Sequence, residues 1–135
     1  MLKNEHEVVI NRPVERVFES VSDFASWTQW HGSGEVEKTT PGPVRVGTVW
    51  KATGEVQGQI ITAIVEVTSC EPDRRFAIKV SGAIHARQSF VFEPVSGGTR
   101  LLVVLELDDP ELVEHARKQW DKDLLILKQL LEAQA

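Results

Sequence analysis

Hydrophobic positions near the start of the chain predict one strand followed by two short helices. The predicted strand spans residues 5–11, in which Val8, Val9 and Ile10 precede the break at Arg12 and Pro13. One face of the next element carries Val14, Val17, Phe18 and Val21, at the i, i+3, i+4 and i+7 spacing of an amphipathic helix. Proline suits the first helical position because the N–H that it lacks would have no partner there. A second short helix or turn is expected over residues 24–30.

From Gly32 to Leu107 the pattern becomes typical of strands. Runs rich in valine, isoleucine, threonine and aromatic residues are separated by glycine and proline, which mark turns. The predicted strands span residues 34–39, 46–53, 56–70, 74–81, 84–94 and 99–107. The connections between them are short, so neighbouring strands are expected to pair as antiparallel hairpins.

Alternation along each strand predicts which side chains face the interior. One face of residues 84–94 carries Ile84, Ala86, Gln88, Phe90 and Phe92, and the other carries His85, Arg87, Ser89 and Glu93. Phe76 and Ile78 are expected to point inward in the same way. A register shifted by one residue would instead turn His85 and Arg87 inward. That alternative would place a cationic anchor inside, suited to an acidic or enolate-forming ligand.

The C-terminal segment predicts a long amphipathic helix. Asp109 is expected to cap this helix, and Pro110 is expected to be its first residue. Its apolar face carries Val113, Ala116, Trp120, Leu124, Leu127 and Leu131. A helix of about 25 residues is roughly 37 Å long, enough to cross a sheet. Asp123 flanks this face and is expected to be a solvated carboxylate, with pairing to an inward-facing cationic group as the alternative. The outer residues Leu125 and Ile126 are either scattered exposed side chains or a patch for self-association.

Together these elements predict a single α+β domain over residues 1–135. A long antiparallel sheet that is covered on one side must curve to bury its inner face. The C-terminal helix is expected to lie across the concave side. A cavity is expected between sheet and helix, where pockets occur in small domains.

Composition narrows the class of protein further. The chain is 41% hydrophobic and 26% charged, which is typical of a globular protein. The formal net charge is −5 and no basic cluster is present, which disfavours nucleic-acid binding. No apolar run approaches the roughly 20 residues of a membrane span, so no stable membrane insertion is expected. Cys70 is the single cysteine, so no internal disulfide can form, and a cytoplasmic location is expected.

Several local motifs occur in an order that resembles a known superfamily. The motifs are Pro13-Val14-Glu15-Arg16-Val17-Phe18, Asp23-Phe24-Ala25-Ser26-Trp27, Val46-Gly47-Thr48, the Glu71-Pro72 corner, Phe90 to Pro94, and Gly97-Gly98-Thr99-Arg100 before the long helix. In this order they resemble the SRPBCC, or START-like, superfamily, which includes the polyketide cyclase/dehydrase-like proteins. The resemblance implies the helix-grip fold: a curved antiparallel sheet of about seven strands wrapped around a long C-terminal helix, with two short helices after the first strand. It also implies an internal cavity for an apolar ligand.

The resemblance leaves the activity open, because a fold does not determine a function. Members of the superfamily include lipid and sterol carriers, plant hormone-binding and allergen proteins, aromatic polyketide cyclases and chaperone-activator-like domains. The first hypothesis is therefore binding of a small hydrophobic ligand, lipid-like or aromatic. The second is a polyketide cyclase or dehydratase acting on a ligand in the same cavity. The third is a protein-interaction module or homodimer that uses the Leu125–Ile126 patch.

Candidate site residues follow from the predicted inner faces. The residues expected to contact the ligand are Trp30, Trp50, Phe76, Ile78, Gln88, Phe90, Phe92, Trp120, Leu124 and Leu127. Gln88 is polar, and a buried amide is costly unless hydrogen-bonded, so it is expected to bind a structural water or a polar end of the ligand.

The candidate catalytic residues are His31 and Arg87. The loop that holds His31 is expected at the mouth of the cavity, where an imidazole could transfer protons; a solvated loop histidine is the alternative. The four histidines are dispersed along the chain, so no metal site is expected, and no cofactor is expected either.

Overall fold

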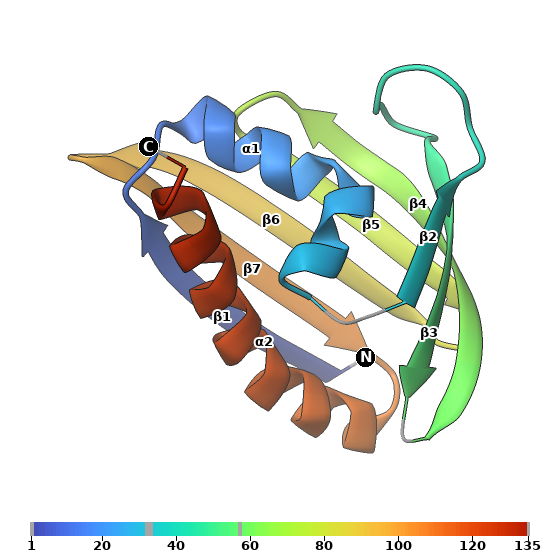
Figure 1. Ribbon diagram of the computed structural model, residues 1–135. Helices are drawn as coiled ribbons and strands as arrows, with labels where there is room; N and C mark the ends of the chain where they lie inside the picture. Colours follow the sequence, from blue (N-terminus) through green and yellow to red (C-terminus); the bar gives the residue numbers. More distant parts are fainter. Residues whose placement is uncertain (1, 32–33, 57, 135) are drawn as a thin grey trace.

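The computed structural model describes residues 2–31, 34–56 and 58–134 (Figure 1). Its strands are β1 (Leu2–Ile10), β2 (Gly34–Lys38), β3 (Val49–Val56), β4 (Gln59–Glu71), β5 (Arg75–Gly82), β6 (Ala86–Val95) and β7 (Gly98–Leu107). Its helices are α1 (Val14–Ser22), the short 3-10 helix η1 (Phe24–Gln29) and α2 (Pro110–Glu132). The order of strand, two short helices, strands and long helix is the predicted one.

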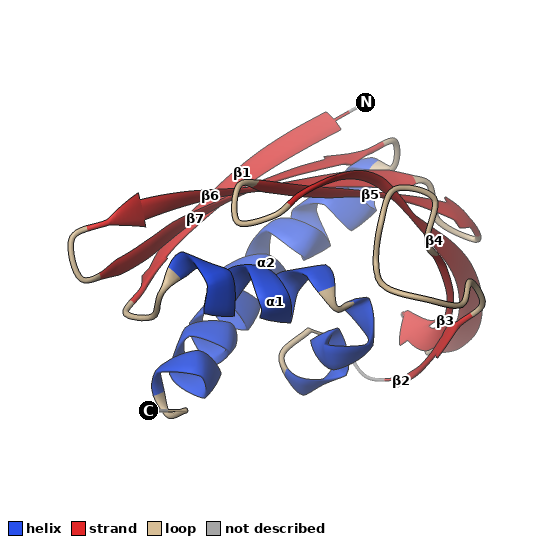
Figure 2. Ribbon diagram, turned by 90° about the horizontal axis from the view of Figure 1, so that it is seen from above, coloured by secondary structure: helices blue, strands red, loops and turns tan. Residues whose placement is uncertain are grey.

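The strands of the described residues form one antiparallel sheet in the order β1-β7-β6-β5-β4-β3-β2. The first strand therefore pairs with the last. Viewed from above, the sheet lies over the helices and curls around them at the end formed by β2, β3 and β4 (Figure 2). Strand twist and cover on a single side account for this curvature. The predicted architecture of a curved antiparallel sheet with a long helix on its concave side is confirmed.

Three strands begin two or three residues later than the sequence pattern predicts. The predicted strand 56–70 begins at Gln59, since Val56 is the last residue of β3. The predicted strand 46–53 begins only at Val49. In the turn before it, the backbone N–H of Arg45 donates to the hydroxyl of Thr48 at 2.9 Å, and Gly47 has a φ of +94°, which favours glycine. The predicted strand 84–94 begins at Ala86, since residues 83–85 connect β5 to β6.

The predicted register of the central strands is confirmed. Ile78 is the partner of Gln88, and Lys79 is the partner of Arg87, across β5 and β6. The inward side chains Phe76, Ile78, Phe90 and Phe92 are at most 3% exposed. His85 and Arg87 are exposed instead. The shifted-register alternative, with these two side chains in the interior, is therefore wrong.

Helix α2 has the predicted N-terminal cap and the predicted buried face, to which the structure adds Asp123. The carboxylate of Asp109 accepts from the backbone N–H groups of Glu111 and Leu112 at 2.9 and 3.4 Å. The buried residues of the helix are Val113, Trp120, Asp123, Leu124, Leu127 and Leu131. Asp123 is only 2% exposed, so the expectation of a solvated carboxylate is wrong.

Polar contacts fasten α2 along the edge strand β1. They are Asn4 Nδ2 to the carbonyl of Val113 at 3.2 Å, His6 Nδ1 with Asp121 Oδ1 at 2.7 Å, Lys128 Nζ to the carbonyl of Val9 at 2.7 Å, and the N–H of Asn11 to Glu132 Oε2 at 2.9 Å. The Lys128 ammonium and the Asn11 N–H hold the pKa of the Glu132 carboxyl below its usual value. The helix is thus fixed at one side of the sheet, while β2, β3 and β4 curl toward it from the other.

We expect His6→Leu to destabilise the fold, because His6 is the buried centre of this contact. Its side chain is 2% exposed, and its two ring nitrogens each lie 2.7 Å from an oxygen, one of Asp121 and one of Asn4. Leucine would leave the Asn4 oxygen buried without a partner, which should lower the free energy of unfolding by about 1–3 kcal/mol. Urea denaturation measures this change. The control His85→Leu, at an exposed position, should change it by less than about 0.5 kcal/mol; equal stability of both variants would contradict a structural role for His6.

Candidate functional site

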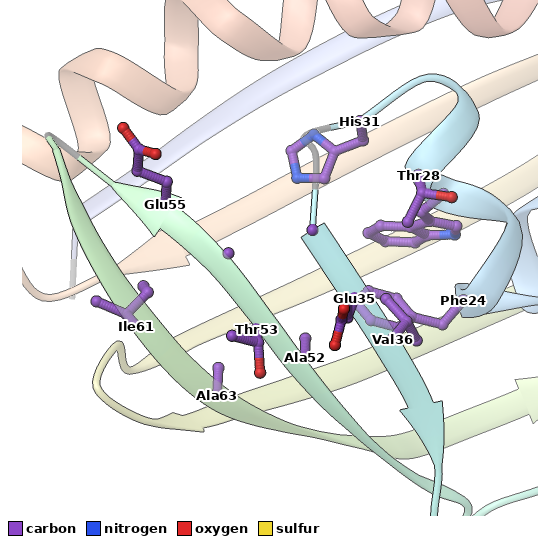
Figure 3. Close-up of a pocket in the computed structure, with 13 residues that line it drawn as sticks. Phe24, Thr28, His31, Glu35, Val36, Ala52, Thr53, Glu55, Ile61 and Ala63 are labelled. Carbon is purple, nitrogen blue, oxygen red and sulfur yellow. The ribbon is translucent and has the colours of Figure 1, made fainter.

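A cavity of about 350 Å³ lies between the concave face of the sheet and α2. Its wall is largely apolar and includes Val65, Ile78, Leu105, Leu112 and Trp120. A side pocket of about 220 Å³ opens beside η1, β2 and β3 (Figure 3). The residues common to the cavity and the side pocket are Phe24, Trp27, His31, Ala52, Glu55 and Ala63. Because they share this wall, the two spaces form one candidate site with two lobes.

The structure places only part of the predicted contact set on the cavity wall. Ile78, Gln88 and Trp120 line the cavity. The remaining predicted residues belong to the core and are at most 4% exposed: Trp30, Trp50, Phe76, Phe90, Phe92, Leu124 and Leu127.

The short helices explain this division of the inner face. The ring of Phe92 lies 5.1 Å from that of Phe18 in α1, and the ring of Phe90 lies 5.4 Å from that of Trp27 in η1. At that end of the sheet, α1 and η1 therefore occupy the space that a ligand would need. Inward-facing residues line the cavity only where no short helix covers them.

The two candidate catalytic residues lie on opposite faces of the sheet. His31 follows η1 and lines both lobes of the site. Arg87 is exposed on the convex face, where its strand neighbours are Lys79 and Glu106. The structure therefore does not bring His31 and Arg87 together as a pair.

Trp27 is the centre of an aromatic cluster that joins η1 to the sheet and to α2. Its ring centroid lies 4.8–5.8 Å from those of Phe24, Trp30, His31, Phe90 and Trp120. Its indole N–H donates to the carbonyl of Val21 at 2.9 Å, so its one polar atom is satisfied inside the protein. Trp27 is 2% exposed and also lines both lobes, so it belongs to the core and to the site wall at once.

His31 is held in one orientation by α2. Its Nδ1 lies 2.6 Å from Oδ2 of Asp123, and the side-chain amide of Gln119 donates to Oδ1 of the same carboxylate at 2.9 Å. The imidazole also packs on the Trp120 ring, with the centroids 4.4 Å apart and the planes 32° apart. In the neutral tautomer that donates from Nδ1 to this carboxylate, Nε2 is an acceptor. In Figure 3 the second ring nitrogen points away from α2, toward the strands.

The polar groups on the described wall include carboxylates but no permanent cation. The described residues that line the cavity and the side pocket include no lysine or arginine. Glu55, at the end of β3, is a carboxylate common to both lobes, and in Figure 3 it lies on the α2 side of the strand, as His31 does. On β6, Oε1 of Gln88 is buried without a hydrogen-bond partner among the described residues. The wall therefore offers no permanent positive charge to pair with an anionic ligand.

Other kinds of functional site lack support in the described part of the chain. No group of three or more histidine, cysteine, aspartate or glutamate side chains is placed there to hold a metal ion. No described helix combines the length and apolarity of a membrane span. Burial raises the pKa of the Cys70 thiol, and Cys70 lies outside the cavity wall, so it contributes no reactive group to the site.

Sequence reasoning missed the contact between His31 and Asp123. One signal was present, because Asp123 lies beside Leu124 and Leu127 on a helix face that is otherwise apolar. A carboxylate there is costly unless it is paired. Its partner lies 92 residues away in the chain, and no periodic pattern relates the two positions.

Comparisons with known proteins agree with this fold. A family model described as polyketide cyclase / dehydrase and lipid transport matches residues 1–132. The comparison with curated proteins finds no match. Among solved structures, protein CV1439 from Chromobacterium violaceum is 21% identical, with a TM-score of 0.79 over 98% of this chain and 99% of that chain.

Two further structures show the range of proteins with this fold. The Aha1 dimer from Colwellia psychrerythraea is 18% identical, with a TM-score of 0.75 over 98% of this chain and 97% of that chain. The di-domain ARO/CYC BexL of the BE-7585A biosynthetic pathway is 17% identical, with a TM-score of 0.75 over 96% of this chain and 46% of that chain. At such identities the likeness concerns the fold alone.

Proposed function

The chain belongs to the family of polyketide cyclase/dehydrase and lipid-transport proteins, and from this premise we propose that it binds a small, uncharged apolar molecule in the cavity beneath α2. The observation that supports the proposal is the apolar lining of that cavity. Apolar side chains from η1, from β3 to β7 and from α2 enclose about 350 Å³. Such a space is within the range of small-molecule sites. Apolar ligand surface that enters it is removed from water, which stabilises the complex by about 25 cal/mol per Å².

The charges of the wall favour an uncharged ligand over an anion. A carboxylate or phosphate that enters the cavity loses its hydration and meets no lysine or arginine among the described lining residues. Glu55 adds repulsion at the boundary between the two lobes. A ligand hydroxyl, in contrast, can donate to the buried oxygen of Gln88. The preferred ligand therefore combines an apolar body with a neutral hydroxyl or carbonyl group.

Isothermal titration calorimetry with three probes that share a naphthalene body tests this function. We expect 2-naphthol to bind in the cavity, and 2-naphthoate to bind at least about tenfold more weakly, a difference of roughly 1.4 kcal/mol. Glu55→Gln should narrow that difference by removing the like charge. Gln88→Leu should weaken the binding of 2-naphthol more than that of naphthalene, because naphthalene has no hydroxyl to donate.

A matched control and two contrary outcomes complete the test. Glu37→Gln removes a carboxylate of β2 that does not line the cavity, so it should leave the ratio of the two affinities as it is in the unchanged protein. Binding of 2-naphthoate as tight as that of 2-naphthol would contradict the preference for uncharged ligands. Failure of all three probes to bind at concentrations up to their solubility in buffer would contradict the binding function itself.

The cyclase or dehydratase hypothesis keeps one of its two predicted residues. Arg87 lies on the convex face and cannot reach a ligand in the cavity. His31 lines the cavity and has a carboxylate partner that the hypothesis did not include. Of the two predicted residues, only His31 can act on a ligand in the cavity, where the other titratable side chains on the described wall are His115 and Glu55.

Self-association through the outer face of α2 stays a prediction. Leu125 and Ile126 are 55% and 44% exposed, as the predicted patch requires. The Aha1 structure is described as a dimer, which makes a homodimer compatible with the fold.

A further inference from the structure

We propose that His31 and Asp123 form a proton-transfer pair that acts on a neutral ketone bound in the cavity, a role that rests on the proposed ligand binding. His31 would be the catalytic base, because it lines the cavity where the ketone would lie. Asp123 would be the positioning residue, because it contacts His31 and not the cavity itself.

The first support is the cost of placing Asp123 where it is. A buried carboxylate destabilises a protein unless its charge and both oxygens are satisfied. Asp123 is 2% exposed and lies on the apolar face of α2, where a leucine or alanine would serve packing at no such cost. Its two oxygens are used by His31 at 2.6 Å and by Gln119 at 2.9 Å. The carboxylate thus binds the Nδ1 edge of the imidazole with one oxygen, while Gln119 occupies the other.

The second support is the orientation that this contact gives to His31. With its hydrogen on Nδ1, the neutral ring presents the lone pair of Nε2 on the side away from α2. Figure 3 shows that nitrogen directed toward the strands that line the site. Stacking on Trp120, at 4.4 Å between centroids, limits rotation of the ring. A fixed base that faces a ligand cavity is the arrangement that general base catalysis requires.

The comparison with His6 shows that the His31 contact is not simply a structural histidine–aspartate pair. His6 also lies 2.7 Å from an aspartate, Asp121, but its second ring nitrogen is used by Asn4 at 2.7 Å. For His31 no described residue occupies Nε2, and its side chain is 29% exposed rather than buried. His31 therefore has a ring nitrogen available to a ligand, which His6 lacks.

The reaction consists of proton transfer at carbon and needs no second reactant. Nε2 takes a proton from the carbon next to the ketone carbonyl, so the C–H bond breaks and an N–H bond forms. The electron pair of that bond forms a carbon–carbon double bond and moves the carbonyl electrons onto oxygen, which gives the enolate. Asp123 stabilises the resulting imidazolium. Return of a proton from Nε2 to carbon restores the ketone, with solvent hydrogen incorporated when the imidazolium has exchanged.

The charges of the wall favour an uncharged substrate such as the proposed ketone. No described lining residue is a lysine or arginine that could pair with an anionic substrate. The side-chain amide of Gln88 both donates and accepts, so it can contact the oxygen of either the keto or the enol form. The apolar wall contacts the remaining carbon skeleton.

Deuterium incorporation at C1 of 2-tetralone, measured by proton NMR in D₂O, tests the inference. The probe has the same bicyclic size as 2-naphthol and carries acidic protons beside its carbonyl. We expect the unchanged protein to accelerate exchange over buffer by roughly 10²–10⁴-fold at saturating protein, which is the usual contribution of a positioned general base. Calorimetric titration of 2-tetralone into the same sample measures binding separately.

Variants then separate catalysis from structure. His31→Ala should abolish the acceleration, and added imidazole should restore part of it, because free imidazole can replace the missing base. Asp123→Asn should lower the exchange rate at saturation at least about tenfold, with a smaller change in the half-saturating concentration. The control His85→Ala, at an exposed position away from the cavity wall, should exchange at the rate of the unchanged protein.

Each contrary outcome has a distinct meaning. If 2-tetralone binds and exchanges no faster than in buffer, the proton-transfer role is overturned while the binding function stands. If His31→Ala exchanges as fast as the unchanged protein, His31 is not the base. If neither 2-tetralone nor 2-naphthol binds, the proposed function fails, and the inference fails with it.

Discussion

Ala63→Trp should abolish binding of 2-naphthol while the protein remains folded. Ala63 lies on β4, is 9% exposed and lines both the cavity and the side pocket. Its methyl group faces space that is free of other side chains, so an indole at this position would occupy the volume that a ligand needs. We expect the affinity for 2-naphthol to fall about 100-fold or more, since overlap with a close-packed ring cannot be relieved by small shifts. Calorimetric titration measures the loss.

The neighbouring residue Thr62 provides the control for this substitution. It precedes Ala63 on the same strand, is exposed, and faces the opposite side of the sheet. Thr62→Trp should therefore leave the affinity for 2-naphthol unchanged. If Ala63→Trp fails to fold, Ala116→Phe closes the same cavity from α2. A folded, blocked variant that binds 2-naphthol as well as the unchanged protein would place the ligand outside this cavity.

The largest loss of stability is expected for Trp27→Ala. Trp27 is 2% exposed, and five aromatic rings surround it within 5.8 Å between centroids. Truncation of a buried tryptophan costs about 3–5 kcal/mol, because the surrounding structure closes the resulting hole only in part. The carbonyl of Val21 would also lose its donor. Since domains are stable by about 5–15 kcal/mol, this single change should remove a large share of the free energy of unfolding.

Urea denaturation followed by circular dichroism measures this effect. Trp27→Phe keeps a ring in the cluster and removes the indole N–H, so it should cost less than Trp27→Ala. Gln29→Ala, at an exposed position of the same 3-10 helix, should change the free energy of unfolding by less than about 0.5 kcal/mol. A loss of less than about 1 kcal/mol for Trp27→Ala would contradict its place at the centre of the core.

Local patterns in the sequence were sufficient for the arrangement of elements. The alternation in residues 84–94 placed Gln88, Phe90 and Phe92 on the inner face, and pairing with β5 and β7 confirms it. The apolar spacing after Asp109 predicted α2 together with its cap. Both features depend on neighbours within a few residues, because strand and helix periodicities repeat over two and 3.6 residues. The order of strands and helices, their inner faces and the curved sheet could therefore be derived from the sequence.

The division of the inner face into core and cavity was decided by tertiary structure. Periodicity shows that Phe90 and Ile78 point inward, but not which of them meets a helix and which meets open space. That depends on where α1 and η1 lie on the sheet, and so on contacts such as Phe18 with Phe92. The same limit applies to Arg87, whose place on the convex face follows from a register that a shift of one residue would have reversed.

The His31–Asp123 contact is the clearest case of information that only the folded chain contains. Each residue alone has an ordinary solvated interpretation, as a loop histidine and as a helix carboxylate. They meet because η1 and α2 pack against the same face of the sheet, which places Trp27 and Trp120 in contact and brings the two polar side chains to 2.6 Å. What the sequence by itself determined was the scaffold, because secondary structure and its buried faces arise from short-range patterns. The functional groups that share one cavity were determined by the tertiary structure, because they come from segments that only long-range packing brings together.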